Sequence, residues 1–476
     1  MTLRAQDWGF STTATGALAI GGVSADDLAR EFGTPLHAVD EEGLRRRARQ
    51  LRAAFEQAYG GAVTSYYALK CNNTPGVVRM VLEEGLQPEV ATLYEWELAR
   101  RLAVPPSRIM VNGPNKGDLL ERAVVEGAGL VVIDSLAELE DLGRLCAERD
   151  RQARILLRVN PAHIPRGMNR ASATGSRRRL VFGLDIRTGE VVQALRRVRD
   201  LPALEFAGFH CHAGTGIRRP EDYVRPIERL AACAAEAAAL GLQTTVIDVG
   251  GGFGVPTSRE LDTLEFLRYQ ALGHLPAPPD ATRFPPIEAF ARTIAGGLER
   301  GVRQHGLPLP SLLLEPGRAV VSGADVLLVR VGQVKQRGGV GTWVVTDGAA
   351  GTVAFPLFYE YHEVFLCRAP HAPRLCTYSL VGPVCFSADW IYREKRMPRI
   401  VPGDVLAVCD AGAYFTVQES SFGFPRPAIV AVRAGQARLL RRRETFEDMV
   451  ARDLDFGGDD EQDGVRDVTA AATGSG

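Results

Sequence analysis

A lysine follows directly on an early apolar run of the chain. The run Val63–Leu69 predicts a buried strand, and Lys70 comes at its end. Desolvation at such a position is expected to lower the pKa of the amine, which favours attack on a carbonyl carbon and formation of a Schiff base. The alternative is an ordinary lysine whose side chain reaches the surface. Lys70 is therefore a candidate for covalent attachment of a carbonyl cofactor.

A run of glycines could bind an anion. Gly250, Gly251 and Gly252 follow the apolar run Val246–Val249. Glycine lets the backbone approach a ligand closely, with several N–H groups turned towards it. A triple glycine alone is weak evidence for phosphate binding. No helix with the Gly-x-Gly-x-x-Gly pattern follows, which argues against a nicotinamide-dependent oxidoreductase.

Polar side chains follow two further apolar runs. His210 and His212 lie on one face of a predicted strand and could suit a metal, but no third ligand from a recognisable motif accompanies them. Thr215 and the glycines beside it fit a phosphate oxygen better. Glu315 would be buried and needs a cationic partner, such as a protonated pyridine nitrogen. An amine, phosphate donors and a carboxylate together match pyridoxal 5'-phosphate (PLP).

The fold must bring these residues together. Short apolar runs alternate with stretches whose apolar residues recur every three or four positions, the period of a helix with one buried face. Eight such alternations predict parallel strands that close into a (β/α)8 barrel, with the active site at the C-terminal ends of the strands. An open, doubly wound sheet is the alternative. The predicted strands are Val63–Leu69, Glu89–Ala91, Ile109–Val111, Leu130–Ile133, Ile155–Val159, Phe206–His210, Val246–Val249 and Leu312–Leu314.

The pattern changes after Arg318. Short β-type runs separated by glycine and proline turns predict a second domain, an antiparallel β-sandwich or barrel. A proline-rich insertion over 256–286 follows the seventh strand, where barrel loops often shape the site. The expected divisions are the barrel over 35–318, the β-domain over 1–34 plus 319–456, and a disordered tail over 457–476.

The composition argues against several classes of protein. A formal net charge of −1 gives no general attraction to nucleic acid. The sequence lacks a window of about twenty apolar residues, so a membrane span is not expected, and Met1–Ala5 lacks the order of a signal peptide. The eight cysteines are scattered, without zinc spacing. We expect a cytoplasmic protein with reduced cysteines, a small-molecule substrate and no metal.

Several motifs together resemble the fold-type III PLP decarboxylases. The resemblance is closest to diaminopimelate decarboxylase and more distant to ornithine and arginine decarboxylases, and it runs from about Gly16 to Leu454. The matching motifs are Glu31–Leu36, Tyr67–Lys70, His210–Gly214, Gly250–Gly254, Glu315–Arg318, Cys385 with Asp389, Ala411–Tyr414 and Arg442–Thr445.

The resemblance implies a role for each matching residue. Lys70 would carry PLP as a Schiff base, His212 would stack on the pyridine face, and Glu315 would face the ring nitrogen. Cys385 would protonate the carbanion after CO2 leaves, and in such families it comes from the other subunit of a head-to-tail homodimer. The remaining matches are contacts to cofactor or substrate: Thr215, Gly251, Gly252, Arg318, Tyr359 and Tyr414.

Two departures from the family pattern bear on the substrate. Phe355 stands where diaminopimelate decarboxylases carry an arginine, and Phe386 stands where they carry a glutamate, directly after Cys385. The two lost groups are expected to hold the distal carboxylate and the distal ammonium of diaminopimelate. A charged terminus buried against two phenyl rings would cost on the order of several kcal/mol. We therefore predict a substrate with an apolar, acylated or otherwise uncharged distal end, in secondary metabolism or siderophore biosynthesis, contacted by Arg318, Phe355, Tyr359, Phe386 and Asp389.

Three alternatives stay open. Arg177–Arg179 could replace the missing arginine, which would leave a genuine meso-diaminopimelate decarboxylase that makes L-lysine. A racemase with the same cofactor would be expected to carry an arginine in place of Glu315 and to lack the Cys385 motif. A catalytically inactive regulatory homologue is disfavoured because Lys70, Glu315 and Cys385 are all retained.

Overall fold

The structure is a computed structural model in which residues 3–166, 181–348, 350–352 and 359–453 are described. Three predictions fall outside these ranges: the substrate contact of Phe355, the role of Arg177–Arg179, and the tail over 457–476. Within the described ranges, every helix is too short or too polar to cross a membrane.

Eight parallel strands close into a barrel, as the sequence predicts. Each strand pairs with its neighbour in order, and the ring is completed where β14 pairs with β5 and β8 pairs with β9. A further short strand, β10 (Leu184–Asp185), pairs with β9 outside the ring. The (β/α)8 prediction is confirmed, and the open sheet is excluded. The barrel strands are β5 (Val63–Ala68), β6 (Gln87–Val90), β7 (Met110–Val111), β8 (Leu130–Ile133), β9 (Ala153–Asn160), β11 (Leu204–His210), β12 (Val246–Asp248) and β14 (Ser311–Leu314).

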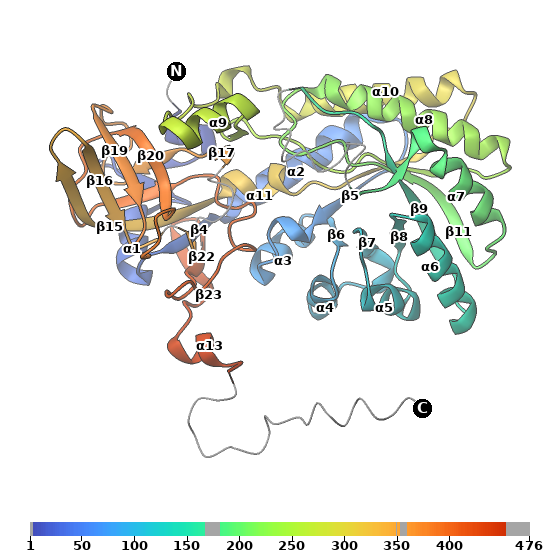
Figure 1. Ribbon diagram of the computed structural model, residues 1–476, viewed down its shortest axis with the longest axis horizontal. Helices are drawn as coiled ribbons and strands as arrows, with labels where there is room; N and C mark the ends of the chain where they lie inside the picture. Colours follow the sequence, from blue (N-terminus) through green and yellow to red (C-terminus); the bar gives the residue numbers. More distant parts are fainter. Residues whose placement is uncertain (1–2, 167–180, 349, 353–358, 454–476) are drawn as a thin grey trace, which may run out of the picture.

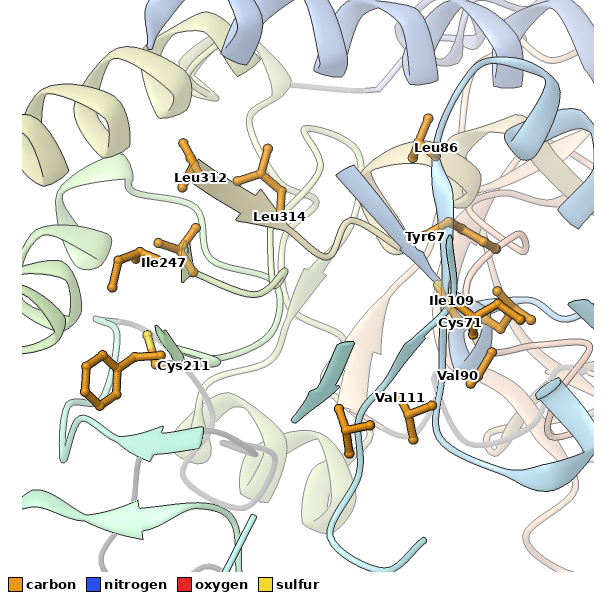
Figure 2. Packing of buried hydrophobic residues seen from close by; sticks show 14 of the residues in the cluster. Tyr67, Cys71, Leu86, Val90, Ile109, Val111, Cys211, Ile247, Leu312 and Leu314 are labelled. Carbon is orange, nitrogen blue, oxygen red and sulfur yellow. The ribbon is translucent and has the colours of Figure 1, made fainter. Parts of the chain in front are cut away.

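Alternation along these strands divides the buried side chains into two sets. Tyr66 packs with an inner cluster that includes Leu156, whereas its neighbour Tyr67 belongs to the outer cluster. The outer cluster fills the space between the strands and the surrounding helices, as Figure 2 shows for Ile247 and Leu314. The barrel is therefore packed on both faces of its sheet, and polar groups are left for the strand ends.

Helices cover the outside of the barrel (Figure 1). Some begin where the sequence supplies an N-cap: the Thr92 hydroxyl accepts from the N–H of Glu95, and the Ser135 hydroxyl accepts from the N–H of Glu138, both at 3.2 Å. The helices around the barrel are α2 (Glu41–Ala58), α3 (Pro75–Glu83), α4 (Leu93–Arg101), α5 (Asp118–Glu126), α6 (Leu136–Arg149), α7 (Glu190–Arg199), α8 (Val224–Ala239) and α10 (Ile287–Gln304).

The second domain is built around the long strand β15 (Asp325–Arg337). It pairs with β4 and β21 along its first part and with β16 along its second. Most pairings in this domain are antiparallel, as predicted, but β4–β22 and β16–β19 are parallel, which the long connections between these strands allow. The other strands are β4 (Leu36–Asp40), β16 (Gly341–Thr346), β18 (Val364–Leu366), β19 (Cys376–Val381), β20 (Trp390–Met397), β21 (Val405–Val408), β22 (Ala428–Arg433) and β23 (Gln436–Arg441).

The chain passes from the β-domain into the barrel slightly later than the sequence indicates. The predicted barrel begins at residue 35, whereas β4 pairs with β15 and β22 in the second sheet. All five residues of β4 are buried, so the strand lies in the core of the β-domain, and the barrel begins with α2. The N-terminal strands β1 (Ser11–Thr12), β2 (Leu18–Ile20) and β3 (Val23–Ser24) form a small sheet, followed by α1 (Ala25–Phe32).

The insertion over 256–286 connects the two domains. Its strand β13 (Arg259–Glu260) pairs with β17 (Glu360–Tyr361), which comes after β16. Its helix α9 (Thr263–Leu272) carries Tyr269, whose hydroxyl accepts a hydrogen bond of 3.1 Å from a backbone N–H of β20. The insertion therefore ties the barrel to two strands of the β-domain.

A buried aspartate reinforces the same junction. The carboxylate of Asp410, which follows β21, accepts hydrogen bonds from Trp8 Nε1 at 2.8 Å, Thr257 Oγ1 at 3.0 Å and Ser322 Oγ at 3.1 Å. These donors come from the N-terminal segment, the insertion and the segment after β14. One carboxylate thus joins four parts of the chain where the domains meet.

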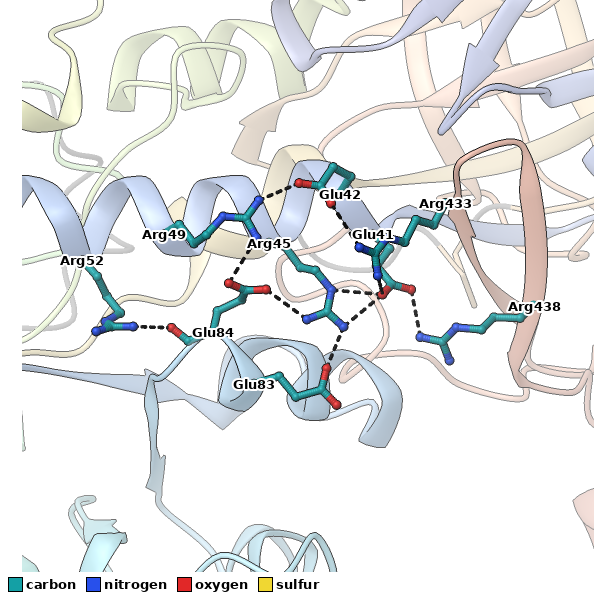
Figure 3. Close-up of polar contacts among 9 residues, drawn as sticks. All are labelled: Glu41, Glu42, Arg45, Arg49, Arg52, Glu83, Glu84, Arg433 and Arg438. Atoms are coloured by element: carbon teal, nitrogen blue, oxygen red, sulfur yellow. Dashed lines mark hydrogen bonds and ion pairs between the residues drawn. The ribbon is translucent and has the colours of Figure 1, made fainter.

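A network of charges connects α2 to its neighbours (Figure 3). The carboxylate of Glu41 pairs with Arg45 at 3.0 Å and with Arg438 on β23 at 2.9 Å. Arg45 also pairs with Glu83 at 2.7 Å and with Glu84 at 3.0 Å, at the end of α3. The side chains of Glu41 and Arg45 are largely shielded from solvent, so this network couples the first barrel helix to the last hairpin of the β-domain.

A buried histidine makes the stability of the β-domain depend on pH. His37 Nδ1 lies 2.9 Å from Asp325 Oδ2, and His37 Nε2 lies 3.2 Å from Glu419 Oε1. Burial alone would lower the pKa of His37, but the two carboxylates outweigh it and raise the pKa from 6.5 to about 9. Because the folded pKa exceeds the unfolded one, the stabilisation is complete below pH 6.5 and is lost as the pH rises through about 9.

We expect the free energy of unfolding to fall by on the order of 2–3 kcal/mol between about pH 6.5 and pH 9 through this group. Urea denaturation at a series of pH values measures the fall. His37→Gln should be less stable at the lower pH and should lose most of the dependence, whereas His305→Gln, at an exposed position, should keep it. Parallel pH profiles for the wild type and His37→Gln would contradict the assignment.

Candidate active site

Lys70 lies in a short turn at the end of β5, and the β-domain holds this turn in place. The backbone N–H of Tyr414 donates to the carbonyl of Cys71 at 2.8 Å. The side-chain amide of Asn72 donates to the carbonyl of Gly412 at 3.0 Å. The lysine is therefore positioned by both domains and not by its own strand alone.

The amine of Lys70 forms an ion pair with Glu89, at the end of β6. Its Nζ lies 2.7 Å and 3.0 Å from the two carboxylate oxygens. The Lys70 side chain is 45% exposed, whereas that of Glu89 is 1% exposed. Burial does act to lower the pKa of Lys70, as the sequence predicts, but the charges of Glu89 and Glu315 outweigh it and raise the pKa above its usual value. The predicted direction is therefore wrong.

The pKa of Glu89 is raised as well as that of Lys70. Burial, together with the nearby charge of Glu315, raises the pKa of Glu89 above its usual range, even though Lys70 acts to lower it. An ammonium group thus lies at hydrogen-bond distance from a carboxylate that binds a proton more readily than usual. Because the pKa of the amine stays above that of the acid, the proton rests on Lys70, and Glu89 is the nearest group that could accept it when the amine attacks a carbonyl.

Glu315 follows β14 and lies among polar groups from three other strands. The amide of Asn112 donates to Glu315 Oε1 at 2.8 Å, and His210 Nε2 lies 3.4 Å from the same oxygen. Burial acts to raise the pKa of Glu315, but His210 and Lys70 outweigh it and hold the pKa far below its usual range. Burial and the charge of Glu315 raise the pKa of Asp248, which lies within 4.8 Å. The group therefore presents an ionised carboxylate beside an acid that binds a proton more readily than usual.

His212 is a neutral imidazole in this setting. Burial lowers the pKa of His212 to about 3, and the positive charges of Arg158 and Lys70 add to the effect. The glycine loop lies against the ring, since a Cβ at Gly250 would be 3.0 Å from His212 Nδ1. An uncharged flat ring held in this way suits contact with an aromatic face.

The glycines after β12 allow three loops to approach one another. A Cβ at Gly251 would lie 2.1 Å from the carbonyl oxygen of Glu315, and one at Gly252 would lie 1.9 Å from that of Gly214. Ile217, from the loop after β11, donates its N–H to the carbonyl of Gly252 at 2.7 Å. The glycine requirement thus follows from backbone packing as well as from any bound anion. Thr215 lies on the same loop as Gly214 and is partly exposed.

Arg318 is already engaged by a carboxylate. Its two terminal nitrogens donate to the two oxygens of Glu360 at 2.7 Å and 2.8 Å, and both side chains are buried. The guanidinium also lies over the ring of Tyr414, 5.3 Å from the ring centre. The sequence predicts Arg318 as a contact to phosphate or substrate but gives no indication of Glu360.

Tyr359 comes directly before β17 and Glu360. Its carbonyl accepts a hydrogen bond of 2.7 Å from the N–H of Leu261 in the insertion. Burial, with the charge of Glu360, raises the pKa of the Tyr359 hydroxyl, so the group stays protonated. The insertion therefore fixes the backbone of a residue predicted to contact substrate.

Cys385, Phe386 and Asp389 lie between β19 and β20 in the β-domain. Asp389 is buried, and its two oxygens accept from the N–H groups of Ala350 and Val384, both at 2.7 Å. Cys385 and Phe386 are exposed. Over the described ranges, no hydrogen bond or ion pair joins these three residues to Lys70 of the same chain.

The structure thus divides the predicted site residues into two groups. Lys70, His212, the glycine loop, Glu315, Arg318 and Tyr414 gather at one end of the barrel. Among the residues that the structure describes, the Cys385 segment forms no hydrogen bond or ion pair with them. Sequence analysis missed Glu89, Asn112 and Glu360. Glu89 and Asn112 are polar residues close to the ends of predicted barrel strands, which is a usable signal, whereas Glu360 has none.

Comparison with known proteins identifies the family. The sequence profile of the pyridoxal-dependent decarboxylases, pyridoxal binding domain, matches residues 42–322. Diaminopimelate decarboxylase of Actinosynnema pretiosum subsp. auranticum is 35% identical over 443 residues, which cover 92% of this chain and 93% of that protein. The chain belongs to the pyridoxal-dependent decarboxylase family.

Further relatives agree with this assignment. Diaminopimelate decarboxylase of Methanothermobacter thermautotrophicus is 33% identical over 439 residues, 91% of this decarboxylase and 95% of that protein. The crystal structure of diaminopimelate decarboxylase from M. jannaschii with L-lysine matches at a TM-score of 0.83 and 25% identity, covering 95% of this chain and 99% of that chain.

The decarboxylase uses PLP, and the residues at the barrel end suit this cofactor. Glu315 is an ionised, buried carboxylate that can pair with a protonated pyridine nitrogen. Lys70 supplies an amine next to a proton acceptor. The loop at Gly250–Gly252 brings the backbone close to its neighbours without side chains, as phosphate binding requires.

We expect Gly251→Ala to lower the affinity for PLP by at least about tenfold, because the added Cβ would collide with the Glu315 carbonyl and displace either the glycine loop or the carboxylate. Titration of the protein with PLP, followed by visible absorption, measures the affinity. Gly338→Ala is the matched control, since no atom lies within 4 Å of the added Cβ. Wild-type affinity in Gly251→Ala would show that the close approach is not needed.

Proposed function

We propose that this decarboxylase removes the α-carboxylate of an amino acid whose distal end is apolar, acylated or otherwise uncharged, in secondary metabolism or siderophore biosynthesis. The observation that carries the proposal is an aromatic surface beside Cys385. Phe386 and Phe422 are 50% and 52% exposed, with ring centres 6.2 Å apart. Such a surface offers contact area but no partner for a charged group.

In this proposal different barrel residues contact different parts of the cofactor. Lys70 binds PLP covalently, and Glu89 takes the proton that the amine must lose. His212 packs on the ring, and Thr215, Gly251 and Gly252 lie at the phosphate. When bound, PLP withdraws the electrons that the departing CO2 leaves behind. Glu315 supports this by keeping the ring nitrogen protonated.

The β-domain completes the proposed site. Tyr414 and Arg318 border the cofactor. Arg318 also faces the substrate, which Tyr359, Phe355 and Phe386 contact. Asp389 acts on the substrate through the shape of the Cys385 loop, because both of its carboxylate oxygens accept from backbone N–H groups.

Cys385 is proposed to protonate the product from the partner subunit of a head-to-tail homodimer. Its exposure beside Phe386 supports a position at a subunit contact. All eight cysteines are free, which supports a place in the reducing cytoplasm.

A second candidate is decarboxylation of meso-diaminopimelate to L-lysine. The names of the relatives favour it, and it requires a cation such as Arg177–Arg179 to replace the missing arginine. The two candidates differ in whether the distal end of the substrate is charged, so one set of substrates distinguishes them.

We expect the PLP-loaded enzyme to release CO2 from an uncharged-tail amino acid with a kcat/KM at least about tenfold above that for meso-diaminopimelate. The substrates tested are D- and L-norleucine, acylated lysine and ornithine, and meso-diaminopimelate. Lys70→Ala is the control and should show neither CO2 release nor the visible absorption of the Schiff base. An equal or faster reaction with meso-diaminopimelate would refute the proposal, and a wild type without that absorption would point to an inactive homologue.

We expect Lys70→Ala and Cys385→Ala to complement each other if the site is shared between subunits. Each variant alone should be nearly inactive, and an exchanged mixture should regain about a quarter of wild-type activity, because half of the dimers then hold one intact site. The rate at which the amine product forms after subunit exchange measures this gain, because Cys385 is proposed to act after CO2 leaves. A mixture no more active than its components would place both residues in one subunit's site.

A further inference from the structure

We propose that Glu360 is a specificity residue that excludes amino acids with a distal carboxylate, because it already occupies the guanidinium of Arg318. The inference rests on the proposed function and deepens it by naming a group that the substrate lacks. Its support lies in the contacts of Glu360 and not in the phenylalanines discussed above.

Glu360 occupies the outer edge of the Arg318 guanidinium, between the two Nη atoms. Arg318 Nη1 and Nη2 each donate to a different oxygen of Glu360, at 2.8 Å and 2.7 Å. This is the fork-to-fork arrangement that an arginine would otherwise offer to a carboxylate on a ligand. The Nε–H and the second N–H of each Nη remain; Nε is buried, and no hydrogen bond to it is formed among the described residues. A second carboxylate at these N–H groups would share a single positive charge that Glu360 already neutralises.

The position of Glu360 is fixed from several sides. His362 Nε2 lies 3.2 Å from Glu360 Oε2, and His362 Nδ1 lies 2.9 Å from the carbonyl oxygen of Cys409. In the β13–β17 ribbon, Glu360 is opposite Glu260, and the next residue of the insertion, Leu261, bonds to Tyr359. Moving Glu360 away from Arg318 would disturb this ribbon.

Electrostatics oppose the replacement of Glu360 by a ligand carboxylate at Arg318. Burial acts to raise the pKa of Glu360, but Arg318 and His362 outweigh it and lower the pKa to about 2, so Glu360 is ionised at neutral pH. A ligand carboxylate that displaced Glu360 would leave a buried charge without its partner, which is strongly unfavourable. A ligand carboxylate that stayed nearby would meet Glu360 and Glu260 as like charges. A neutral distal group meets neither obstacle.

The test uses glutarate, a dicarboxylate without an amino group, and the PLP-loaded enzyme in titration calorimetry. We expect Glu360→Gln to bind glutarate at least about tenfold more tightly than the wild type, because the neutral amide releases the guanidinium. Glu363→Gln is the matched control: Glu363 is also buried, pairs with Lys395 at 3.0 Å and Arg374 at 2.9 Å, and makes no contact with Arg318. It should bind glutarate no better than the wild type.

A kinetic measurement accompanies the glutarate titration. The kcat/KM ratio of norleucine to 2-aminoadipate, two amino acids of equal chain length, should fall at least about tenfold in Glu360→Gln, through a lower KM for 2-aminoadipate. The double variant Arg318→Met with Glu360→Leu removes the pair without leaving a lone charge and should not gain glutarate binding.

The results distinguish a failure of this inference from a failure of the proposed substrate class. Tight binding of glutarate by the wild type would overturn the inference, and this measurement requires no variant. Binding by the wild type as tight as by Glu360→Gln, or tight binding by the double variant, would overturn it as well. If glutarate binds as expected but no uncharged-tail amino acid is decarboxylated, the proposed substrate class fails and the role of Glu360 stands. If the substrates react as proposed but the norleucine-to-2-aminoadipate ratio is unchanged in Glu360→Gln, the inference fails alone.

Discussion

The distribution of protons among three buried acids and one amine determines what this barrel can do. Glu89, Asp248 and Glu315 lie close together at the strand ends, and three buried carboxylates near one another cannot all ionise. Asn112 and His210 stabilise the charge on Glu315, and that charge raises the pKa of Asp248. A cofactor with a cationic ring therefore finds one counter-ion of fixed position, and the lysine beside it retains its own proton acceptor.

Most of the fold follows from local pattern. The barrel was predictable because helical and strand periods alternate regularly between Val63 and Leu314, and the polar residues at strand ends mark its open end. β20 was not predictable in the same way, since the charged residues in Trp390–Met397 interrupt its apolar pattern. The boundary after β4 was also missed, because an isolated buried strand does not reveal which sheet it joins.

The types of residue in the candidate site were predictable from the sequence, but the residues that pair with them were not. Side-chain types at the strand ends indicate an amine, an anion site and a carboxylate, which suffice for PLP. The sequence does not reveal that Glu89 pairs with Lys70 or that Glu360 pairs with Arg318, because neither pairing follows from the spacing of the residues along the chain. The pKa of the lysine was therefore predicted in the wrong direction: burial could be inferred, but the partner could not.

The hydrogen bonds from Asn72 to Gly412 and from Tyr414 to Cys71 make the orientation of Lys70 depend on the β-domain. The segment matched by the family profile ends at residue 322, before both β-domain partners, so the matched segment does not contain all the contacts that orient its own lysine. A barrel of this kind cannot be transplanted onto an unrelated second domain without rebuilding the lysine turn. The lysine turn is therefore expected to lose its geometry when the barrel and the β-domain are separated.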